Sequence, residues 1–421
     1  MSKLFYSETG RVMHLVCEEL SKRRHARKVL HLPARVTTGG TLYVLGKARD
    51  GCALPLRVTV NGREFALAPC DPPSYYWSWY ALPLAATDVR GGENVIELWS
   101  DNAAMNGWML ALSGAVENPD SALSLDGGQS WQNERMSVQH CVRGEYIVRL
   151  RLDESALADS APPAMRWERP DHPQFAELRA LVPGEIQTIT APWARARALA
   201  SWVSRQFTCS WGDTQPYQHA EYCPWDAQTI LAWRKAHYGE FQANPIAFCV
   251  HYGFTFVSFA LALGIPARCV CGTGGLLDRK GGHFVSEVWM EAWKKWCCID
   301  PFPDIVFLDG GIPLSFLEMA TSTQETLLPL IERGPGYACH PESRNNSYEY
   351  HAISDTFALR ALWPRNDFLS HPEYTPYAHG AGYYAETDWL WAGEGQHDTL
   401  GMFPNRVTTE HWHTPPPAEW R

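Results

Sequence analysis

The stretch 247–302 combines one helical repeat with three short apolar runs. After Cys249, apolar residues recur at every third or fourth position, which is the period of an amphipathic helix. Gly264 and Pro266 follow the last of these residues and predict that the helix ends there. Three β-prone runs come next, and each predicts a strand: 268–271, 284–290 and 296–300. The predicted order is therefore one helix followed by three strands.

A thiol, an imidazole and a carboxylate occur in this stretch, each at a position where the predicted local structure would present it to the other two. Cys249 begins the predicted helix, whereas His283 and Asp300 lie on neighbouring predicted strands. A free thiol has a pKa of about 8.5, and a helix N-terminus with an imidazolium beside it lowers that pKa into the thiolate range. Asp300 would hold the imidazole tautomer and stabilise the cation of His283. This arrangement suits a nucleophilic thiol.

The same stretch resembles the transglutaminase-like family of papain-fold cysteine enzymes. The resemblance covers about residues 190–305 and rests on these pieces: Cys249 with Tyr252 three residues on, G-I-P-A-R at 264–268, His283 with Glu287 and Val288, and Trp296 before Asp300 and Pro301. It implies that Cys249 is the nucleophile and that His283 is the general base and acid. Asp300 would then orient the imidazole.

Beyond this stretch the sequence predicts an α+β multidomain fold. An N-terminal arm or helix is expected over residues 1–27, and a jelly-roll-like β-sandwich over 28–160. The transglutaminase-like, papain-fold catalytic core is expected over 165–335. An aromatic-rich C-terminal extension, 336–421, is expected to pack on that core.

The N-terminal arm or helix ends in a cluster of basic residues that is expected to be solvated. Its members are Lys22, Arg23, Arg24, Arg27 and Lys28. In the sandwich, L-R-V-T-V-N-G and G-G-E-N-V-I-E-L resemble the galactose-binding-like jelly rolls of carbohydrate-active enzymes. The aromatic loop Y-Y-W-S-W-Y, at 75–80, suits either a sugar platform or a packing face against the next domain, and we favour packing.

Six residues are predicted to contact the substrate. Four lie between two predicted helices that precede the nucleophile, and two follow it: Trp211, Gln215, Tyr217 and Trp225, then Tyr252 and Glu287. Trp211 and Gln215 are also candidates for the side chain that completes an oxyanion hole with the backbone N–H of the nucleophile.

Charge and cysteine spacing exclude several kinds of partner. A net charge of −10 and a pI of about 5.9 argue against nucleic acid and anionic membranes as the main partners. No secretory signal and no membrane-spanning apolar run is visible, so a cytoplasmic protein is expected. The 12 cysteines show no C-x-x-C spacing, and neither a metal nor a cofactor is expected. The sequence leaves the oligomeric state open.

The predicted function is a cysteine enzyme that acts on an amide bond of a peptide or glycopeptide through a thioester, with hydrolysis favoured over acyl transfer. In a first alternative, the same cleft acts on a saccharide, and Glu287 and Asp300 are the nearest carboxylates for that chemistry. In a second alternative, the protein binds glycans without catalysis and the triad is inert.

Overall fold

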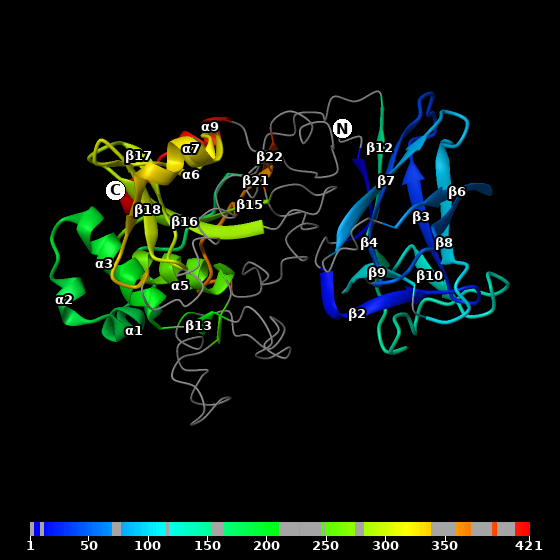
Figure 1. The fold of residues 1–421 in the computed structure, drawn as a ribbon, viewed down its shortest axis with the longest axis horizontal. Helices are drawn as coiled ribbons and strands as arrows, with labels where there is room; N and C mark the ends of the chain where they lie inside the picture. The colour runs from blue at the N-terminus through cyan, green and yellow to red at the C-terminus, as the bar shows by residue number, and fades with distance from the viewer. Residues whose placement is uncertain are drawn as a thin grey trace.

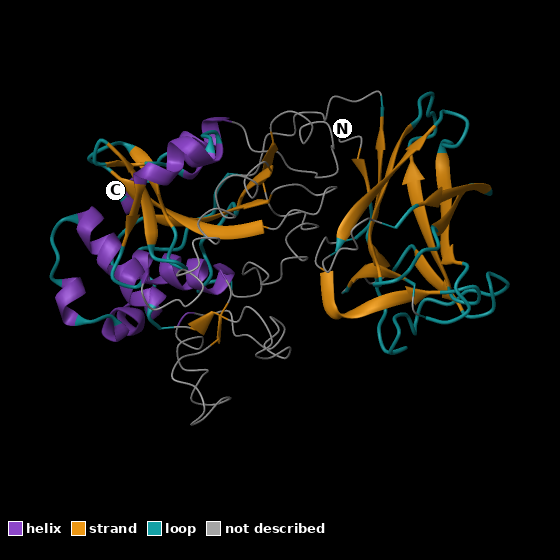
Figure 2. Cartoon of the chain, viewed as in Figure 1, coloured by secondary structure: helices purple, strands orange, loops and turns teal. Residues whose placement is uncertain are grey.

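The structure is a computed structural model of the 421-residue chain. It describes residues 4–8, 12–69, 77–105, 107–114, 118–153, 164–206, 208–209, 227, 246–247, 249–273, 282–337, 359–371, 390–393 and 409–421. An all-β part and an α+β part lie at opposite ends of its longest axis (Figure 1). Helices occur only in the second part among the described residues (Figure 2). The α+β multidomain class is therefore confirmed.

Two antiparallel sheets form the N-terminal part. The first sheet has seven strands: β1 (Leu4–Phe5), β2 (Val12–Leu20), β4 (Gly40–Ala48), β7 (Ser78–Leu84), β9 (Trp108–Ser113), β11 (Glu145–Tyr146) and β12 (Val148–Leu152). The second sheet has five: β3 (His25–Leu32), β5 (Leu56–Val60), β6 (Arg63–Leu67), β8 (Gly92–Ser100) and β10 (Ser121–Ser124).

The two sheets share one apolar core. Burial alternates along β5 and β8, so that every second side chain points inward, as a half-buried strand requires. Leu42 and Val44 of the first sheet belong to the same buried cluster as Val58 and Leu98 of the second. Two sheets packed over a common core make this part a sandwich.

The described part of residues 1–27 does not form the expected arm or helix, because β2 pairs with β9 and β3 begins at His25. The expectation of a fully solvated basic cluster is also wrong. Lys28 is fully buried because inward and outward side chains alternate along β3, and its amine binds Glu145. Arg24 is 4% exposed and donates from Nε to Glu18 at 2.6 Å.

The described part of the aromatic loop is buried. Trp79 packs edge-on against Tyr43 with ring centroids 6.5 Å apart, and Tyr80 packs edge-on against Trp108 at 4.9 Å. These two residues of the motif therefore serve packing, as favoured. Tyr80 belongs to the core that the two sheets share, whereas Trp79 belongs to a buried cluster that also contains residues of the α+β part. Residues 70–76 lie outside the described part of the chain.

The α+β part is built on a five-stranded antiparallel sheet in the order β17, β16, β15, β21, β22. Its strands are β15 (Ala267–Thr273), β16 (Gly282–Met290), β17 (Lys295–Ile299), β21 (Leu359–Leu362) and β22 (Leu390–Gly393). The longer helices are α1 (Gln174–Leu181), α3 (Pro192–Ser204) and α5 (Cys249–Ala262), and α5 contacts α1, α3, β15 and β16. The three strands predicted within 268–300 are confirmed as β15, β16 and β17.

Short elements surround this sheet. They are α2 (Gly184–Gln187), β13 (Thr208–Cys209), β14 (Ile246–Ala247), β18 (Ile305–Asp309), β19 (Ile312–Pro313), α6 (Phe316–Ala320), α7 (Gln324–Leu327), η3 (Leu328–Leu330), β20 (Ile331–Arg333), α9 (Thr409–His413) and η8 (Ala418–Trp420).

Two strands of the central sheet come from the predicted C-terminal extension. β21 pairs with β15, with Val270 opposite Leu362, and β22 pairs with β21. The sequence predicted a boundary between residues 335 and 336, yet strands beyond it complete the sheet of the core. These two described strands of the extension are therefore part of the core rather than a layer packed on it.

Helix α5 ends where the sequence predicts. Gly264 has a φ of 72°, a value that glycine adopts without steric cost. The N–H of Ile265 donates to the carbonyl of Ala260 at 2.8 Å, and that of Gly264 donates to Leu261 at 2.9 Å. These two bonds form a Schellman motif, which satisfies the last carbonyls of the helix.

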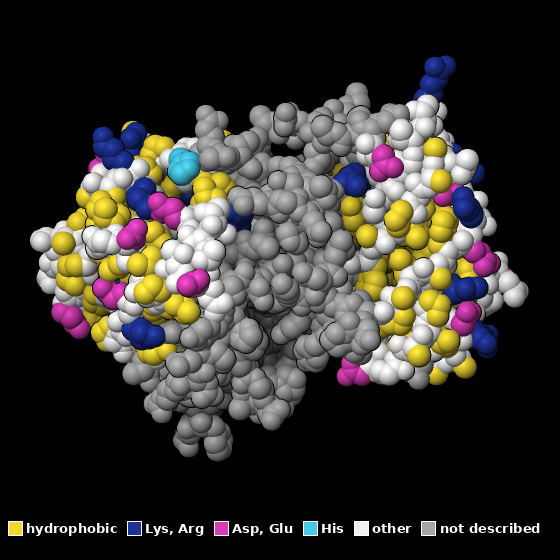
Figure 3. All heavy atoms as spheres, turned by 45° about the horizontal axis from the view of Figure 1, so that its top comes forward, with side chains coloured by type: hydrophobic (Ala, Val, Ile, Leu, Met, Phe, Trp, Pro, Cys, Tyr) yellow, Lys and Arg dark blue, Asp and Glu magenta, His cyan; other side chains and the backbone are white. Residues whose placement is uncertain are grey.

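On the face shown in Figure 3, basic and acidic side chains of the described residues are interspersed. Within those residues, no helix is both long and apolar enough to cross a membrane.

Candidate active site

Helix α5 carries Cys249 at its first position, as a half-buried free thiol. The next turn lies very close to β16. Ser286 Oγ donates to the carbonyl of Gly253 at 3.2 Å, and a Cβ atom on Gly253 would lie 2.6 Å from Phe284 Cδ1. Glycine thus lets the helix approach the strand that carries the imidazole.

His283 and Asp300 form a buried hydrogen-bonded pair. Nε2 of His283 lies 2.5 Å from Oδ2 of Asp300, and both residues are 4% exposed. A carboxylate can only accept, so Nε2 carries the proton. The other oxygen, Oδ1, accepts from the N–H of Phe302 at 3.1 Å, and the backbone of Asp300 exchanges two hydrogen bonds with Ile305. The carboxylate is therefore held on both sides.

The electrostatics of the pair favour an imidazolium. Burial lowers the pKa of His283, but the charge of Asp300, its hydrogen bond and the contact with Cys249 together raise that pKa to about 10. The contribution of Cys249 comes from a side-chain hydrogen bond, so the thiol lies within reach of the ring. Because Nε2 contacts Asp300, Nδ1 is the nitrogen left for the thiol. The structure thus brings the three predicted residues into one row.

Tyr252 was predicted to bind the substrate, and this prediction is wrong because its side chain is fully buried. Its ring packs on that of Phe302 at 4.9 Å, and Phe302 lies 6.1 Å from the ring of His283. Tyr252 therefore supports the ring of Phe302, which in turn lies beside the imidazole of His283. The sequence showed the helical period of α5 but not that the helix is buried on nearly all sides.

Glu287 is also fully buried, and the prediction that it binds substrate is wrong. Its Oε2 accepts from Nε of Arg268 at 2.8 Å, and its Oε1 accepts from the N–H of Phe316 at 2.8 Å. Both oxygens are thus bound within the protein. The saccharide alternative needs two carboxylates that flank the bond, and it loses one of its two candidates.

The other four predicted substrate contacts, Trp211, Gln215, Tyr217 and Trp225, lie outside the described residues and stay predictions. Two further residues of the site were not predicted from the sequence: Gly253, which sets the helix against β16, and Phe302, which supports the imidazole. A glycine within an otherwise apolar helix is the signal that could have marked the first, because it indicates a close approach.

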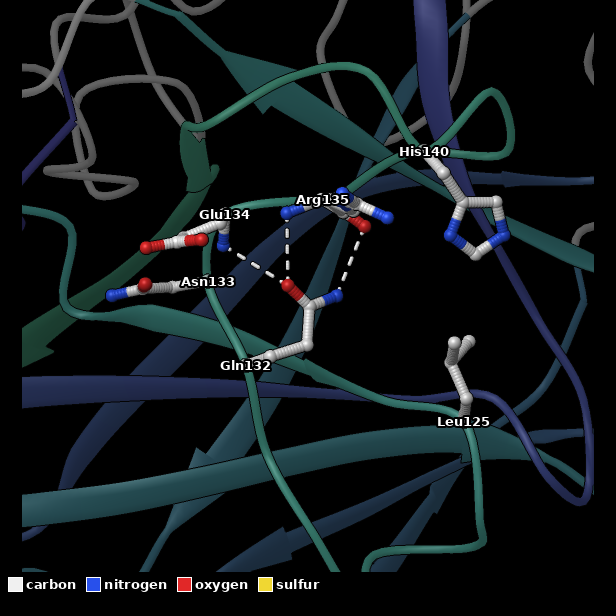
Figure 4. Close-up of a pocket in the computed structure, with 6 residues that line it drawn as sticks. All are labelled: Leu125, Gln132, Asn133, Glu134, Arg135 and His140. Atoms are coloured by element: carbon white, nitrogen blue, oxygen red, sulfur yellow. Dashed lines mark hydrogen bonds between the residues drawn. The ribbon is translucent and has the colours of Figure 1, made fainter.

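A pocket of about 540 Å³ lies in the sandwich (Figure 4). Its lining residues are Leu125, Gln132, Asn133, Glu134, Arg135 and His140, and none of them belongs to the row of Cys249, His283 and Asp300. The side chain of Gln132 holds the backbone of the loop, because its Oε1 accepts from the N–H groups of Glu134 and Arg135. In the described part of the chain, no group of three or more His, Cys, Asp or Glu residues could hold a metal ion.

The family model of the transglutaminase-like superfamily matches residues 179–301, a range that contains Cys249, His283 and Asp300. Residues 179–301 form a transglutaminase-like domain. The match supports a cysteine-dependent enzyme at the level of the superfamily.

Two solved structures similar to this chain are those of a candidate cysteine protease from Cytophaga hutchinsonii and of red sea bream transglutaminase. The first is 13% identical with a TM-score of 0.23, and the alignment covers 66% of this chain and 75% of that one. The second is 12% identical with a TM-score of 0.22, and the alignment covers 64% of this chain and 49% of that one. The chain thus spans about half the length of the transglutaminase. A comparison with curated proteins gives no match.

Proposed function

We propose that the protein is a cysteine-dependent enzyme that hydrolyses an amide bond of a peptide or glycopeptide. The observation that carries this proposal is the position of His283, whose ring bridges the Cys249 thiol and the Asp300 carboxylate. A transglutaminase-like domain at 179–301 supports it.

In the first half of the reaction, the thiol of Cys249 gives its proton to His283, and the resulting thiolate sulfur attacks the carbonyl carbon of the substrate. The C–N bond breaks as the imidazolium of His283 gives its proton to the leaving amine, and a thioester remains. Asp300 stabilises the imidazolium before the transfer and holds the ring afterwards. The raised pKa of His283, about 10, keeps the proton available at neutral pH.

In the second half, neutral His283 takes a proton from water, the oxygen attacks the thioester carbonyl, and the thiolate leaves. Acyl transfer would use the same three residues with an amine in place of water. We propose water as the acceptor, because water needs no binding site of its own.

The two alternatives have less support. Glu287, one of the two carboxylates available for saccharide hydrolysis, is engaged by Arg268. An inert triad would not need an imidazole held on one side by a buried carboxylate and on the other by a half-exposed thiol.

The proposal is tested by thiol labelling and by activity. We expect iodoacetamide to modify Cys249 of the folded protein at pH 6 faster than Cys141, an exposed thiol in the sandwich. We expect Cys249→Ala to lower hydrolysis of a peptide and glycopeptide library by more than about 10³-fold. Cys141→Ala is the matched control and should keep full activity. Full activity in Cys249→Ala, or resistance of Cys249 to alkylation, would show that the nucleophile is assigned wrongly.

A further inference from the structure

Arg268 of β15 is a buried cation that lies between two tryptophans. Its side chain is 2% exposed, and Cζ lies 4.0 Å from the ring centroid of Trp296 and 5.7 Å from that of Trp412. Nε and Nη2 bind Oε2 of Glu287, at 2.8 and 2.6 Å. Nη1 and Nη2 also donate to the backbone carbonyls of His411 and Trp412, at 3.1 and 3.0 Å. The guanidinium is therefore shared between strand β16 and helix α9.

The segment 409–421 is linked to both strands that lead to the site, directly to β17 and through Arg268 to β16. Glu287 lies on β16, the strand that carries His283. Trp296 lies on β17, at whose end the carboxylate of the site follows. The indole N–H of Trp296 donates to the carbonyl of Thr414 at 2.9 Å. Buried side chains thus connect both β16 and β17 to the same short segment.

The far end of the segment is anchored to a different part of the domain. The indole N–H of Trp420 donates to the carbonyl of Glu168 at 2.8 Å, and its ring packs against Phe175 of α1 at 6.0 Å. Trp167 packs against Trp420 and stacks on Trp296 with ring centroids 6.1 Å apart. The segment therefore spans from the start of the helical layer to the strands of the sheet.

We propose that the contact between Trp412 of α9 and Arg268 positions the His283–Asp300 pair for reaction with Cys249, with Arg268 and Trp412 as positioning residues. The inference rests on the proposed function of the site. Neither positioning residue belongs to the row of reacting groups. Loss of the Trp412 contact lets β16 and β17 shift against α5, and a misplacement of about 1 Å can cost about 100-fold in rate.

The test compares two tryptophans of the segment that are equally buried. Trp412 is 4% and Trp420 is 6% exposed, but only Trp412 packs on the cation that holds β16. The readout is the rate constant for alkylation of Cys249 by iodoacetamide between pH 5 and 10, which needs no substrate and is measured well below the melting temperature of each variant. A role in stability alone would lower the melting temperature and leave this pH profile unchanged.

We expect Trp412→Ala to slow the alkylation of Cys249 at pH 6 by about 10- to 100-fold and to change the shape of its pH profile. Trp412→Phe should restore most of the wild-type rate, and Trp420→Ala should keep the wild-type profile. If Trp412→Ala does not fold, Trp412→Leu takes its place. A wild-type profile in the Trp412 variant, or the same shift in Trp420→Ala, would overturn the inference. An unreactive Cys249 in the wild-type protein would instead overturn the proposed function.

Discussion

Gly253 of α5 lies directly against the ring of Phe284 on β16. A Cβ atom on Gly253 would lie 2.6 Å from Cδ1 and 2.8 Å from Cε1 of that ring, and Phe284 is 1% exposed. The contact lies one turn after Cys249, so it sets the distance between the thiol and the strand of His283.

The first prediction concerns this contact. Alanine normally stabilises a helix by about 1 kcal/mol relative to glycine, but here its methyl group must displace a buried ring. We expect Gly253→Ala to lower the free energy of unfolding by about 1–3 kcal/mol and to slow the alkylation of Cys249. Gly184→Ala is the control, because among the described residues no atom outside its own turn lies within 4 Å of the position that its Cβ would take. This control should be neutral or slightly stabilising, and equal effects of the two substitutions would show that the contact with Phe284 has no role.

The second prediction concerns pH. Asp300→Asn removes the charge that raises the pKa of His283, so burial dominates and the pKa falls below its ordinary value of 6.5. In the wild-type protein, activity that needs the imidazolium should fall as the pH rises through about 10. In Asp300→Asn this fall should move down by several pH units. The measurement is the pH dependence of kcat/KM, and the exposed Asp309→Asn variant should match the wild type.

The same pair links stability to pH. The pKa of His283 is raised in the folded state, from 6.5 to about 10. The stabilisation from the charged ring is therefore fully present below pH 6.5 and is lost as the pH rises through about 10. Denaturant unfolding at pH 6 and pH 10 should show a larger loss for the wild type than for Asp300→Asn. Parallel losses would mean that the ring is not charged in the fold.

The third prediction concerns the buried pair of Arg268 and Glu287. Glu287→Gln leaves the guanidinium buried without its counter-ion, which costs about 3–5 kcal/mol of folding free energy. The exposed pair of Arg169 and Asp171, 71% and 73% exposed, offers the comparison. Asp171→Asn should leave the melting temperature unchanged, because water screens that pair. Urea unfolding of both variants decides the point, and similar midpoints would contradict it.

The fourth prediction concerns the core of the sandwich. Lys28→Met should destabilise the protein by about 3–5 kcal/mol, because Glu145 is then buried without the amine that it binds. The double variant Lys28→Met with Glu145→Leu should recover much of this loss, since it removes both charges. Lys22→Met, in the exposed part of the same basic cluster, should unfold at the wild-type midpoint. A double variant no more stable than the single one would argue against a charge effect.

Local signals predicted the centre of the α+β part well. Gly264 and Pro266 predicted the end of α5 because both act through the backbone of their own turn. The β-prone runs predicted β15, β16 and β17, since each is bounded by turn residues. The approach of Cys249, His283 and Asp300 was expected from the predicted helix and its neighbouring strands together with a family resemblance, because no local rule alone places residues of a helix and two strands side by side.

Features that depend on distant partners were not predicted. β21 is four residues long, and its strand character comes from pairing with β15 far earlier in the chain. Tyr252 is buried against Phe302, and Glu287 is buried with Arg268. These partners lie far away in the sequence, so the residues next to Tyr252 and Glu287 do not reveal the burial. At the N-terminus, the order of polar and apolar residues in 12–20 fits a helical turn nearly as well as a strand, and pairing with β9 decides the outcome.

The pairing of β21 with β15 affects which fragments of this domain are stable and when the domain can fold during synthesis. A fragment that stops at residue 301 or 335 leaves the N–H and C=O groups of β15 open along one side, and such an edge readily joins a second molecule. Such a fragment should therefore aggregate even though it holds all three residues of the site. During synthesis, the five-stranded sheet cannot be completed until residue 393 has left the ribosome. Cys249 is therefore synthesised long before the sheet that packs on its helix is complete.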